Sequence, residues 1–377
     1  MLLRLVVSAL AAAAFSVAPA GVHAASGEQP EPEYRLIVID GFDEGHSAAF
    51  GLNDHGVAVG RGANGTQGWQ AFIWEPGRGS RVLEARDGSS VATAINNNGD
   101  AVGYIQTNEN GMEPLQWTRT GETIPLGARN GPAHAKAISD GGYITGVHYG
   151  NGGTRTAFLY QIDGPFSMET LTSMPEDCAV ATAAAVNAHG VVAGAVHALA
   201  TSKAAIWTGG QHQVIAAEHW LNSEATAIND EGVVAGWYET RPNHPQAFLW
   251  RPDSGVLEVE ASGGSSVQLF SINDRGQGAG AEADSRNMRR AIVWDEERGS
   301  RDLNGLVELP GDGWRLTEAR AINNRGWIAG TADVLGVSRA FVLQPIQETH
   351  ERTTPPAVAR AGSDAMPSAA LAQGGIW

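Results

Sequence analysis

Cysteine is almost absent from this chain, and its scarcity limits the kinds of fold that are possible. Cys178 is the single cysteine among 377 residues. No intramolecular disulfide can form, so a disulfide-stapled scaffold is excluded and the fold must be stable through its own core. A lone cysteine without a matching base motif gives no support to a cysteine nucleophile either.

Positive charge is also scarce. The chain has 25 lysines and arginines against 41 aspartates and glutamates, which gives a formal charge of −16. Such a surface repels the phosphates of nucleic acids and the headgroups of anionic lipids. We therefore expect no nucleic-acid partner.

Long apolar runs are confined to the N-terminus. Arg4 is followed by an apolar run from Leu5 to Val17, and Val22-His23-Ala24 fits a small-x-small cleavage site. These features predict a secretory signal peptide over residues 1–24, with an uncleaved N-terminal anchor as the alternative. No cysteine lies beside the cleavage site and no later run is long enough to cross a bilayer, so we expect no lipid anchor and no stable membrane insertion. The mature chain is expected to be exported, to a periplasm or outside the cell.

Glycine, by contrast, is abundant, with 48 residues, and much of it belongs to one repeated pattern. An Asn-x-x-Gly turn is followed about 21 residues later by the end of an apolar strand, seven times along the chain. The first residues of the turns, called anchors below, are Asn53, Asn96, Ser139, Asn187, Asn229, Asn273 and Asn323. The large residues that end the strands are Trp74, Trp117, Tyr160, Trp207, Trp250, Trp294 and Leu343. A fixed period of this kind identifies a repeat architecture.

Each repeat is predicted to hold four strands. In the fifth repeat these are Ala225–Ile228, Val233–Tyr238, Ala247–Trp250 and Val256–Val259. Four short strands in about 45 residues is the size of one propeller blade. The seventh repeat lacks its fourth strand.

An isolated strand before the first repeat supplies the missing one. Residues Tyr34–Ile39 are expected to form a strand that has no other partner in the repeat scheme. Placed in the last blade, this strand closes the ring and removes two exposed sheet edges. We therefore predict an all-β, seven-bladed β-propeller over residues 34–344. Residues 25–33 are expected to form a polar lead-in, and residues 345–377 a disordered tail.

The residues that most resemble motifs also have structural explanations. Asn at the first turn position can bond the turn backbone, and Gly at the fourth accepts a positive φ. A metal-binding loop is the alternative, but the position after the anchor holds both carboxylates and other residues: Asp54, Asp230, Asp274, Asn97, Ala188 and Asn324. A calcium loop needs more oxygen ligands than this. The strand-end tryptophans are expected to pack between sheets rather than to bind sugars.

Four third strands carry a further signature: Gln70-Ala-Phe72, Thr156-Ala-Phe158, Gln246-Ala-Phe248 and Arg339-Ala-Phe341. Following Asn-x-x-Gly turns, these strands resemble the bacterial extracellular repeats called HAF, over nearly the whole mature domain. Every match departs from the eponymous His, and two other repeats have Ala205-Ile206 and Ala291-Ile292 instead. The resemblance implies an exported, propeller-like repeat protein in a bacterium. It transfers no active-site residue.

Function is expected on one face of the ring. In a propeller, the connections from the second to the third strand and from the fourth strand to the next blade lie on the same side, and ligands usually bind there. Two of these connections are long, Met174–Val180 and Leu306–Thr317, although neutral insertion is an equal explanation. The candidate binding residues on this face are His46, His134, Arg155, His219, Trp220, Tyr238, Arg241 and Trp314, with His244 and Arg289 nearby.

Three functional hypotheses remain. The leading one is a non-catalytic binding module that recognises a carbohydrate, a peptide or an envelope partner and is expected to be a monomer. The alternative is a propeller lyase or hydrolase that uses a His/Glu cluster on the same face, with Glu44 and Glu218 beside two of the histidines. The third is a purely structural surface protein. No nucleophile elbow, phosphate loop, zinc-binding helix or calcium loop is present, so we assign no catalytic residue, metal or cofactor.

Overall fold

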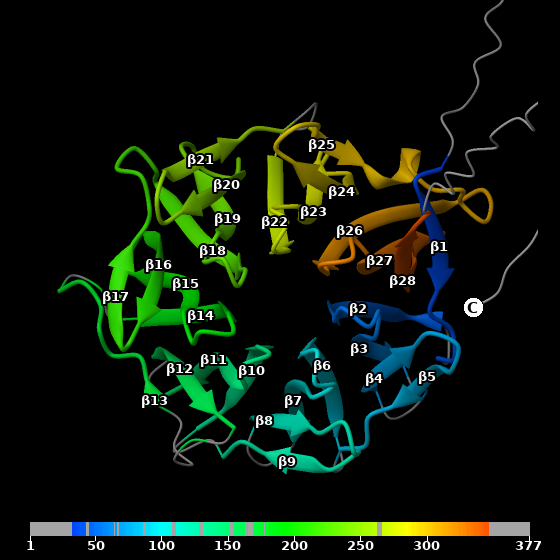
Figure 1. Cartoon of the computed structure of the whole chain (residues 1–377), viewed down its shortest axis with the longest axis horizontal. Coiled ribbons are helices and arrows are strands. Elements are labelled where there is room, and N and C mark those ends of the chain that lie inside the picture. The colour runs from blue at the N-terminus through cyan, green and yellow to red at the C-terminus, as the bar shows by residue number, and fades with distance from the viewer. Residues whose placement is uncertain are drawn as a thin grey trace, which may run out of the picture. The chain divides into compact units, whose positions relative to one another are not determined.

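The computed structural model describes residues 32–346, apart from 43–44, 64, 66–67, 86–87, 108–110, 128–130, 151–153, 163, 165–168, 177, 179 and 262–265. The predicted signal peptide, most of the lead-in and nearly all of the predicted tail lie outside these residues. Within them, seven four-stranded antiparallel sheets stand around a central axis as the blades of a propeller (Figure 1). The predicted fold class is confirmed.

Blades 1 to 6 follow the chain from the innermost strand to the outermost. They consist of β2 Ser47–Leu52, β3 Ala58–Ala63, β4 Trp69–Glu75 and β5 Gly79–Val82; β6 Ser89–Ile95, β7 Ala101–Thr107, β8 Gly111–Trp117 and β9 Thr123–Pro125; β10 Ala133–Ile138, β11 Tyr143–Tyr149, β12 Arg155–Gln161 and β13 Glu169–Thr170. The next three are β14 Val180–Val186, β15 Val192–His197, β16 Ser202–Thr208 and β17 Gln211–Val214; β18 Asn222–Ile228, β19 Val234–Glu239, β20 Gln246–Arg251 and β21 Gly255–Val259; β22 Ser266–Ile272, β23 Gly278–Ala283, β24 Arg289–Asp295 and β25 Gly299–Asp302. A short 3-10 helix, η4 (Leu303–Gly305), leads to blade 7.

Blade 7 joins the two ends of the domain. Its strands are β26 Trp314–Ile322, β27 Ile328–Val334 and β28 Val337–Pro345, with β1 (Tyr34–Val38) as the fourth. β1 pairs antiparallel with β28, from Tyr34 opposite Pro345 to Val38 opposite Phe341. The ring is therefore closed by the N-terminal strand, as the sequence predicts.

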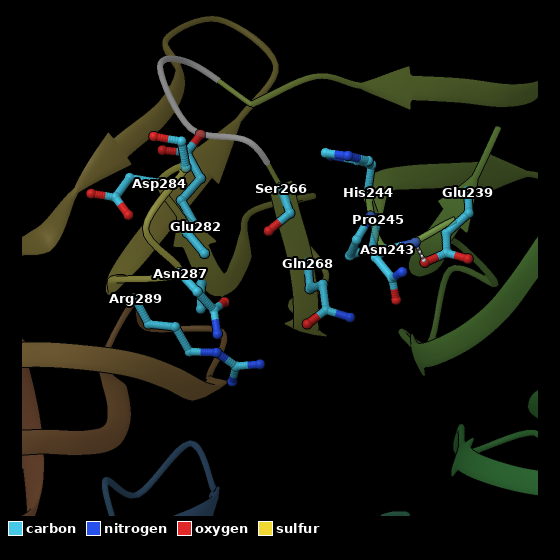
Figure 2. A pocket seen from close by; sticks show the side chains of 13 residues that line it. Glu239, Asn243, His244, Pro245, Ser266, Gln268, Glu282, Asp284, Asn287 and Arg289 are labelled. Carbon is cyan, nitrogen blue, oxygen red and sulfur yellow. Dashed lines mark hydrogen bonds between the residues drawn. The ribbon is translucent and has the colours of Figure 1, made fainter. Parts of the chain in front are cut away.

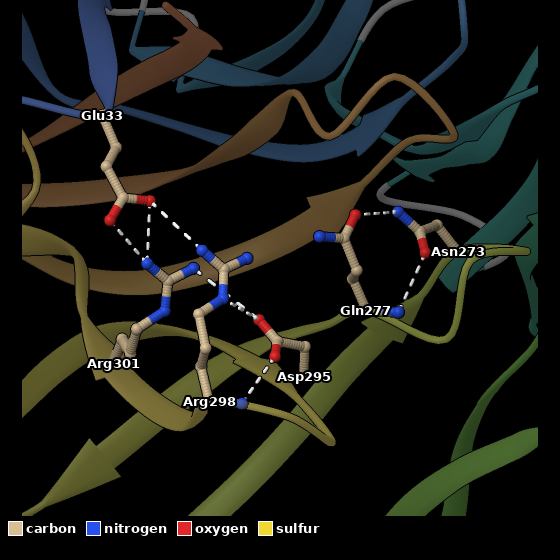
Figure 3. Close-up of polar contacts among 6 residues, drawn as sticks. All are labelled: Glu33, Asn273, Gln277, Asp295, Arg298 and Arg301. Carbon is tan, nitrogen blue, oxygen red and sulfur yellow. Dashed lines mark hydrogen bonds and ion pairs between the residues drawn. The ribbon is translucent and has the colours of Figure 1, made fainter.

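A cluster of charges holds this N-terminal strand against blade 6 (Figure 3). Both carboxylate oxygens of Glu33 accept from Nη1 of Arg301 at 2.7 Å, and Arg298 lies 3.8 Å from the same carboxylate. Asp295 lies between the two guanidinium groups. The backbone N–H of Glu33 also donates to the carbonyl of Leu306 at 2.9 Å. The last residue of the predicted lead-in is thus bonded to the propeller.

Each blade packs on the next through apolar side chains. The strand-end residues Trp117 and Trp207 are 2% and 1% exposed, and their indole N–H groups donate to the carbonyls of Glu84 and Ser173 at 2.8 and 2.9 Å. Burial of a large apolar side chain contributes about 1.5–3 kcal/mol. The tryptophans are core residues of the sheet interfaces, as expected.

Each anchor asparagine does two things. In blade 5, Oδ1 of Asn229 accepts the backbone N–H of Val233 at 2.8 Å, and Gly232 has a φ of 79°, so the predicted turn is confirmed. Nδ2 of Asn229 donates to the carbonyl of Asn273 in blade 6 at 3.0 Å. The side chain therefore closes its own turn and also joins two blades.

These links run almost completely around the axis. The anchor amides donate from Asn53 to Asn96, Asn96 to Ser139, Asn187 to Asn229, Asn229 to Asn273, Asn273 to Asn323 and Asn323 back to Asn53. Ser139 has no amide to donate, so the ring is broken between blades 3 and 4.

The residues that directly follow the anchors form a second ring of hydrogen bonds. Here a side-chain oxygen of one blade accepts the backbone N–H of the blade before it: Asp54 to Asn97, Asn97 to Asp140, Ala188 to Asp230, Asp230 to Asp274, Asp274 to Asn324 and Asn324 to Asp54, with the donor first. Ala188 has no side-chain oxygen, so this ring is also broken between blades 3 and 4. That junction is joined by neither ring.

Candidate functional site

The two ends of the ring carry different groups. The anchor turns surround a cavity of about 160 Å³ at one end of the axis. There the carboxylates already accept backbone N–H groups and the amides of Asn97 and Asn324. Among the described residues, no group of histidine, cysteine or carboxylate side chains is arranged to hold a metal ion. The opposite end, called the loop face, carries the connections between second and third strands.

The loop face contains a larger pocket between blades 5 and 6, of about 590 Å³ (Figure 2). One wall is formed by β19 and the connection that follows it, and the other by β23 and its following connection, with β22 between them. Its polar lining residues include Glu239, Asn243, His244, Gln268, Asp284 and Arg289. Amide, carboxylate and guanidinium groups therefore converge on one polar hollow.

Some of these groups are fixed by partners within the fold. Glu239 accepts the backbone N–H of Asn243 at 3.1 Å. Glu282 is 1% exposed and forms an ion pair with Arg290. Arg289 forms an ion pair with a carboxylate of blade 7. The pocket is preorganised by these contacts, and a preorganised polar pocket loses less freedom when it binds a ligand.

A second concentration of functional groups lies at the axis. The innermost strands have a β-bulge three residues before the anchor in every blade. Residues three and five positions before the anchor are partly exposed toward the axis in most blades, whereas the residue between them is buried. In blade 3 these two axial residues are His134 and Lys136.

Further side chains from blades 2 to 5 approach these two residues. The ring of His134 lies 5.6 Å from that of Tyr104 and 5.5 Å from that of Tyr149, and the Arg155 guanidinium lies 5.9 Å from the ring centre of Tyr149. We call the following residues the axial cluster: Tyr104, His134, Lys136, Tyr149, Arg155, Thr182, His197 and Glu224. Within it, Thr182 Oγ1 and His197 Nε2 are 2.9 Å apart.

Burial sets the protonation states in the axial cluster. Burial, followed by the charges of Lys136 and Arg155, lowers the pKa of His134 to about 4. The pKa of His197 is lowered by the same three causes. Burial also lowers the pKa of the Lys136 ammonium, although Glu224 opposes that shift. Burial raises the pKa of Glu224, against the effects of Lys136 and Arg155. Both histidines are therefore neutral at neutral pH.

The stability of the chain should depend on His134 in acid. Its pKa is near 6.5 in the unfolded chain and about 4 in the fold, so protonation favours the unfolded state as the pH falls from 6.5 to 4. After allowance for solvent screening, this histidine alone should lower the free energy of unfolding by about 2 kcal/mol over that interval. Urea unfolding at a series of pH values should show a smaller fall in His134→Gln. The exposed His189→Gln should retain the whole fall, and equal curves for the two variants would contradict the assignment.

His219, Trp220 and Tyr238 form a separate group at the outer side of blade 5. All three bond the carboxylate of Glu258, at 2.8, 2.8 and 3.1 Å. The Trp220 and Tyr238 rings stack with centres 4.4 Å apart. They are only 7% and 4% exposed, because they pack on Phe248 in the core of the blade. These two candidates are therefore interior residues rather than an exposed platform.

The remaining candidates are dispersed. His46 is partly buried before β2, and its carbonyl accepts the N–H of Ala63 at 2.8 Å. Arg241 is exposed in the connection after β19. Trp314 begins β26 and packs partly buried against the core of blade 7. The three histidine candidates thus do not meet, and Glu44 lies outside the described residues.

The two long connections also pack on the core. Met174 and Cys178 contact the apolar cluster between blades 3 and 4. Leu306 and Leu309 contact that of blade 7. The predicted connection Leu306–Thr317 ends earlier than expected, because β26 already begins at Trp314. Their described residues line neither the loop-face pocket nor the axial cluster.

Lys136 and Glu224 were absent from the sequence-derived candidates, yet the sequence holds a signal for Glu224. The residues five positions before the anchors are Ala48, Val91, His134, Thr182, Glu224, Gln268 and Glu318. This position changes from blade to blade, whereas the next one is Ala in six of the seven repeats. A variable position inside a regular repeat marks a side chain that packing does not dictate.

Comparison with known proteins finds similarity at the level of the fold alone. No family model and no curated protein matches the chain. Among solved structures, the β-propeller domain of the trilobed protease of Pyrococcus furiosus matches at 10% identity with a TM-score of 0.55, over 81% of this chain and 99% of that domain. That domain is described as having an open velcro topology, whereas β1 closes the ring here.

Two bacterial proteins are similar at the same level. A puromycin-hydrolysing peptidase of Mycobacterium tuberculosis matches at 11% identity with a TM-score of 0.50, over 76% of this chain and 50% of that one. The chain therefore spans half the length of that peptidase. TolB of Acinetobacter baumannii matches at 11% identity with a TM-score of 0.48, over 73% of this chain and 76% of that one.

In the described part of the chain, no helix has the length and apolar character needed to cross a bilayer. The seven sheets and the likeness to a propeller domain make the chain a β-propeller module.

Proposed function

We propose that this propeller is an exported, non-catalytic module that binds a polar ligand, a carbohydrate or a short peptide, on its loop face. One observation carries the proposal: the 590 Å³ pocket between blades 5 and 6 brings amide, carboxylate and guanidinium groups together around one hollow. Sugars and peptides present the matching hydroxyl, amide and charged groups. A few well-placed polar groups in a concave site are typical of ligand recognition.

The proposal that the protein is exported rests on its sequence. Residues 1–24 have the charged start, apolar run and cleavage site of a signal peptide, and the resemblance to HAF-type repeats supports the same location. N-terminal sequencing of the native protein should find a chain that begins at Ala25. A chain that begins at Met1 would contradict processing.

The geometry favours binding over catalysis by the predicted histidines. His134 lies at the axis, whereas His219 bonds Glu258 at the outer side of blade 5. A lyase or hydrolase that used both would need them within reach of one substrate atom. Their separate partners leave no such arrangement among the described residues.

Filling the pocket should abolish recognition. Ser285 is an exposed lining residue of the pocket, so Ser285→Trp should occupy the hollow without disturbing a core contact. A glycan and peptide array would supply the ligand, and calorimetry its affinity. We expect Ser285→Trp to weaken binding at least tenfold, or about 1.4 kcal/mol.

The matched control places the same side chain at the other end of the ring. Ser254 is exposed in the turn between β20 and β21, and Ser254→Trp should bind as the unchanged protein does. Equal loss in both variants, or an array ligand that Ser285→Trp still binds, would refute the pocket as the site.

A further inference from the structure

We propose a second binding site, in the axial cluster, where Lys136 and Arg155 together hold the carboxylate of a hydroxylated organic acid such as an acidic sugar. This site is separate from the pocket between blades 5 and 6. It rests on different residues, and it does not depend on the function proposed for that pocket.

The first argument is that the two cations share a single neighbouring carboxylate, that of Glu224, and form no ion pair with it. Arg320, the axial cation of blade 7, forms an ion pair with Glu318 and lies 4.5 Å from the ring centre of Phe270. In contrast, neither Lys136 nor Arg155 forms an ion pair with any described carboxylate. The positive charge of Arg155 lowers the pKa of the Lys136 ammonium, so the two cations lie close enough to repel each other. Two cations beside one carboxylate leave a local excess of positive charge in a chain with a formal charge of −16, and this excess is arranged for an external anion.

The second argument is the rarity of lysine. The chain has two lysines, Lys136 and Lys203, beside 23 arginines. Lys203 is exposed on β16, whereas Lys136 is partly buried and sits on the β-bulge of β10. Bulges re-aim side chains and recur beside binding sites. Neighbouring blades have Thr93 or Ala184 at this position, so the fold itself does not require a cation there.

The third argument is that polar side chains able to bond a ligand surround these cations. Nδ1 of His134 is buried and has no hydrogen-bond partner among the described residues. Tyr104 and Tyr149 flank that ring, and Thr182 and His197 supply further polar groups from blade 4. A buried polar atom without a partner destabilises the fold, and a bound ligand that supplies the partner recovers this loss.

Glu224 restricts the class of anion. Its carboxylate is close enough to interact with both Lys136 and Arg155. It would repel a doubly charged phosphate more strongly than a singly charged carboxylate. The same carboxylate can accept hydrogen bonds from hydroxyl groups. A ligand with one carboxylate and several hydroxyls therefore fits the cluster better than a phosphate does.

Calorimetry on the intact protein tests this site with glucuronate, glucose and inorganic phosphate as probes. We expect glucuronate to bind at least tenfold more tightly than glucose or phosphate. Lys136→Met keeps most of the length of the side chain and removes its charge, so it should weaken glucuronate binding at least tenfold. Arg155→Met should act in the same direction.

Lys203→Met is the matched control, because it removes the other lysine of the chain without touching the axial cluster. It should leave glucuronate affinity unchanged, and so should Ser285→Trp, which fills the other pocket. Thermal unfolding should confirm that each variant is folded. Unchanged affinity in both Lys136→Met and Arg155→Met would overturn the proposal, as would equal loss in Lys203→Met, loss in Ser285→Trp instead, or phosphate binding above glucuronate.

Discussion

Replacing Gly236 by alanine should lower the free energy of unfolding by about 3 kcal/mol, at the upper end of the cost of overpacking. A Cβ at this position would lie 2.2 Å from the carbonyl oxygen of Glu224 and 2.5 Å from the ring of Phe248. The carbonyl belongs to the paired backbone of β18, and Phe248 is fully buried. Neither neighbour can move without breaking strand pairing or core packing. Urea unfolding followed by circular dichroism measures the loss.

The same restriction applies in every blade. The glycine seven residues after each anchor meets a carbonyl of the innermost strand, with Cβ–O distances of 1.9 to 2.2 Å: Gly60, Gly103, Gly146, Gly194, Gly236, Gly280 and Gly330. Gly311→Ala is the matched control, because a Cβ there would meet no atom within 4 Å. We expect that control to change stability by less than about 0.5 kcal/mol. Similar losses for Gly236→Ala and Gly311→Ala would show that close approach is not the cause.

Replacing Asn229 by alanine should cost about 3 kcal/mol. The change removes the bond that Oδ1 accepts from Val233 and the bond that Nδ2 donates to Asn273 in the next blade. Asn229 is 5% exposed, so water does not readily replace either partner. Each lost buried hydrogen bond costs about 1–1.5 kcal/mol, and the unpaired groups add to this. Chemical denaturation reports the sum.

Ser139 provides the comparison for this prediction. Its hydroxyl accepts the N–H of Tyr143 at 3.3 Å, but it cannot donate to the anchor of blade 4, Asn187. Ser139→Ala should therefore cost only about 1 kcal/mol, and Ser139→Asn should complete the ring and stabilise the chain by about 1 kcal/mol. If Ser139→Ala were as costly as Asn229→Ala, the links between blades would contribute nothing.

Much of the fold could be predicted because its cause is local. A turn that begins at Asn229 and ends at Gly232 needs only its own side chain and a positive φ. The repeat pattern and its turns located the strands of the fifth repeat to within three residues of β18 and its three neighbours. The orphan strand that begins at Tyr34 could be assigned because seven repeats of four strands lacked one member.

The candidate site was predicted only in part, because its members come from different blades. His134 and Arg155 were named, but no sequence pattern joined them to Lys136 and Glu224, which lie two and 90 positions beyond His134 in the chain. Trp220 and Tyr238 were assigned to a face from their place in the repeat. Their burial depends on Phe248 and Glu258, which only the folded blade brings to them.

The sequence by itself determined the number of blades, the turns and the strand that closes the ring, because each depends on residues near in the chain or on a count of repeats. The tertiary structure alone decided which groups meet. Anchor amides join neighbouring blades, glycines leave room for a neighbouring carbonyl, and two cations come together at the axis beside a single carboxylate, that of Glu224. The physical reason is that the repeat specifies each blade separately, whereas burial and charge at the axis are set by all the blades that surround it.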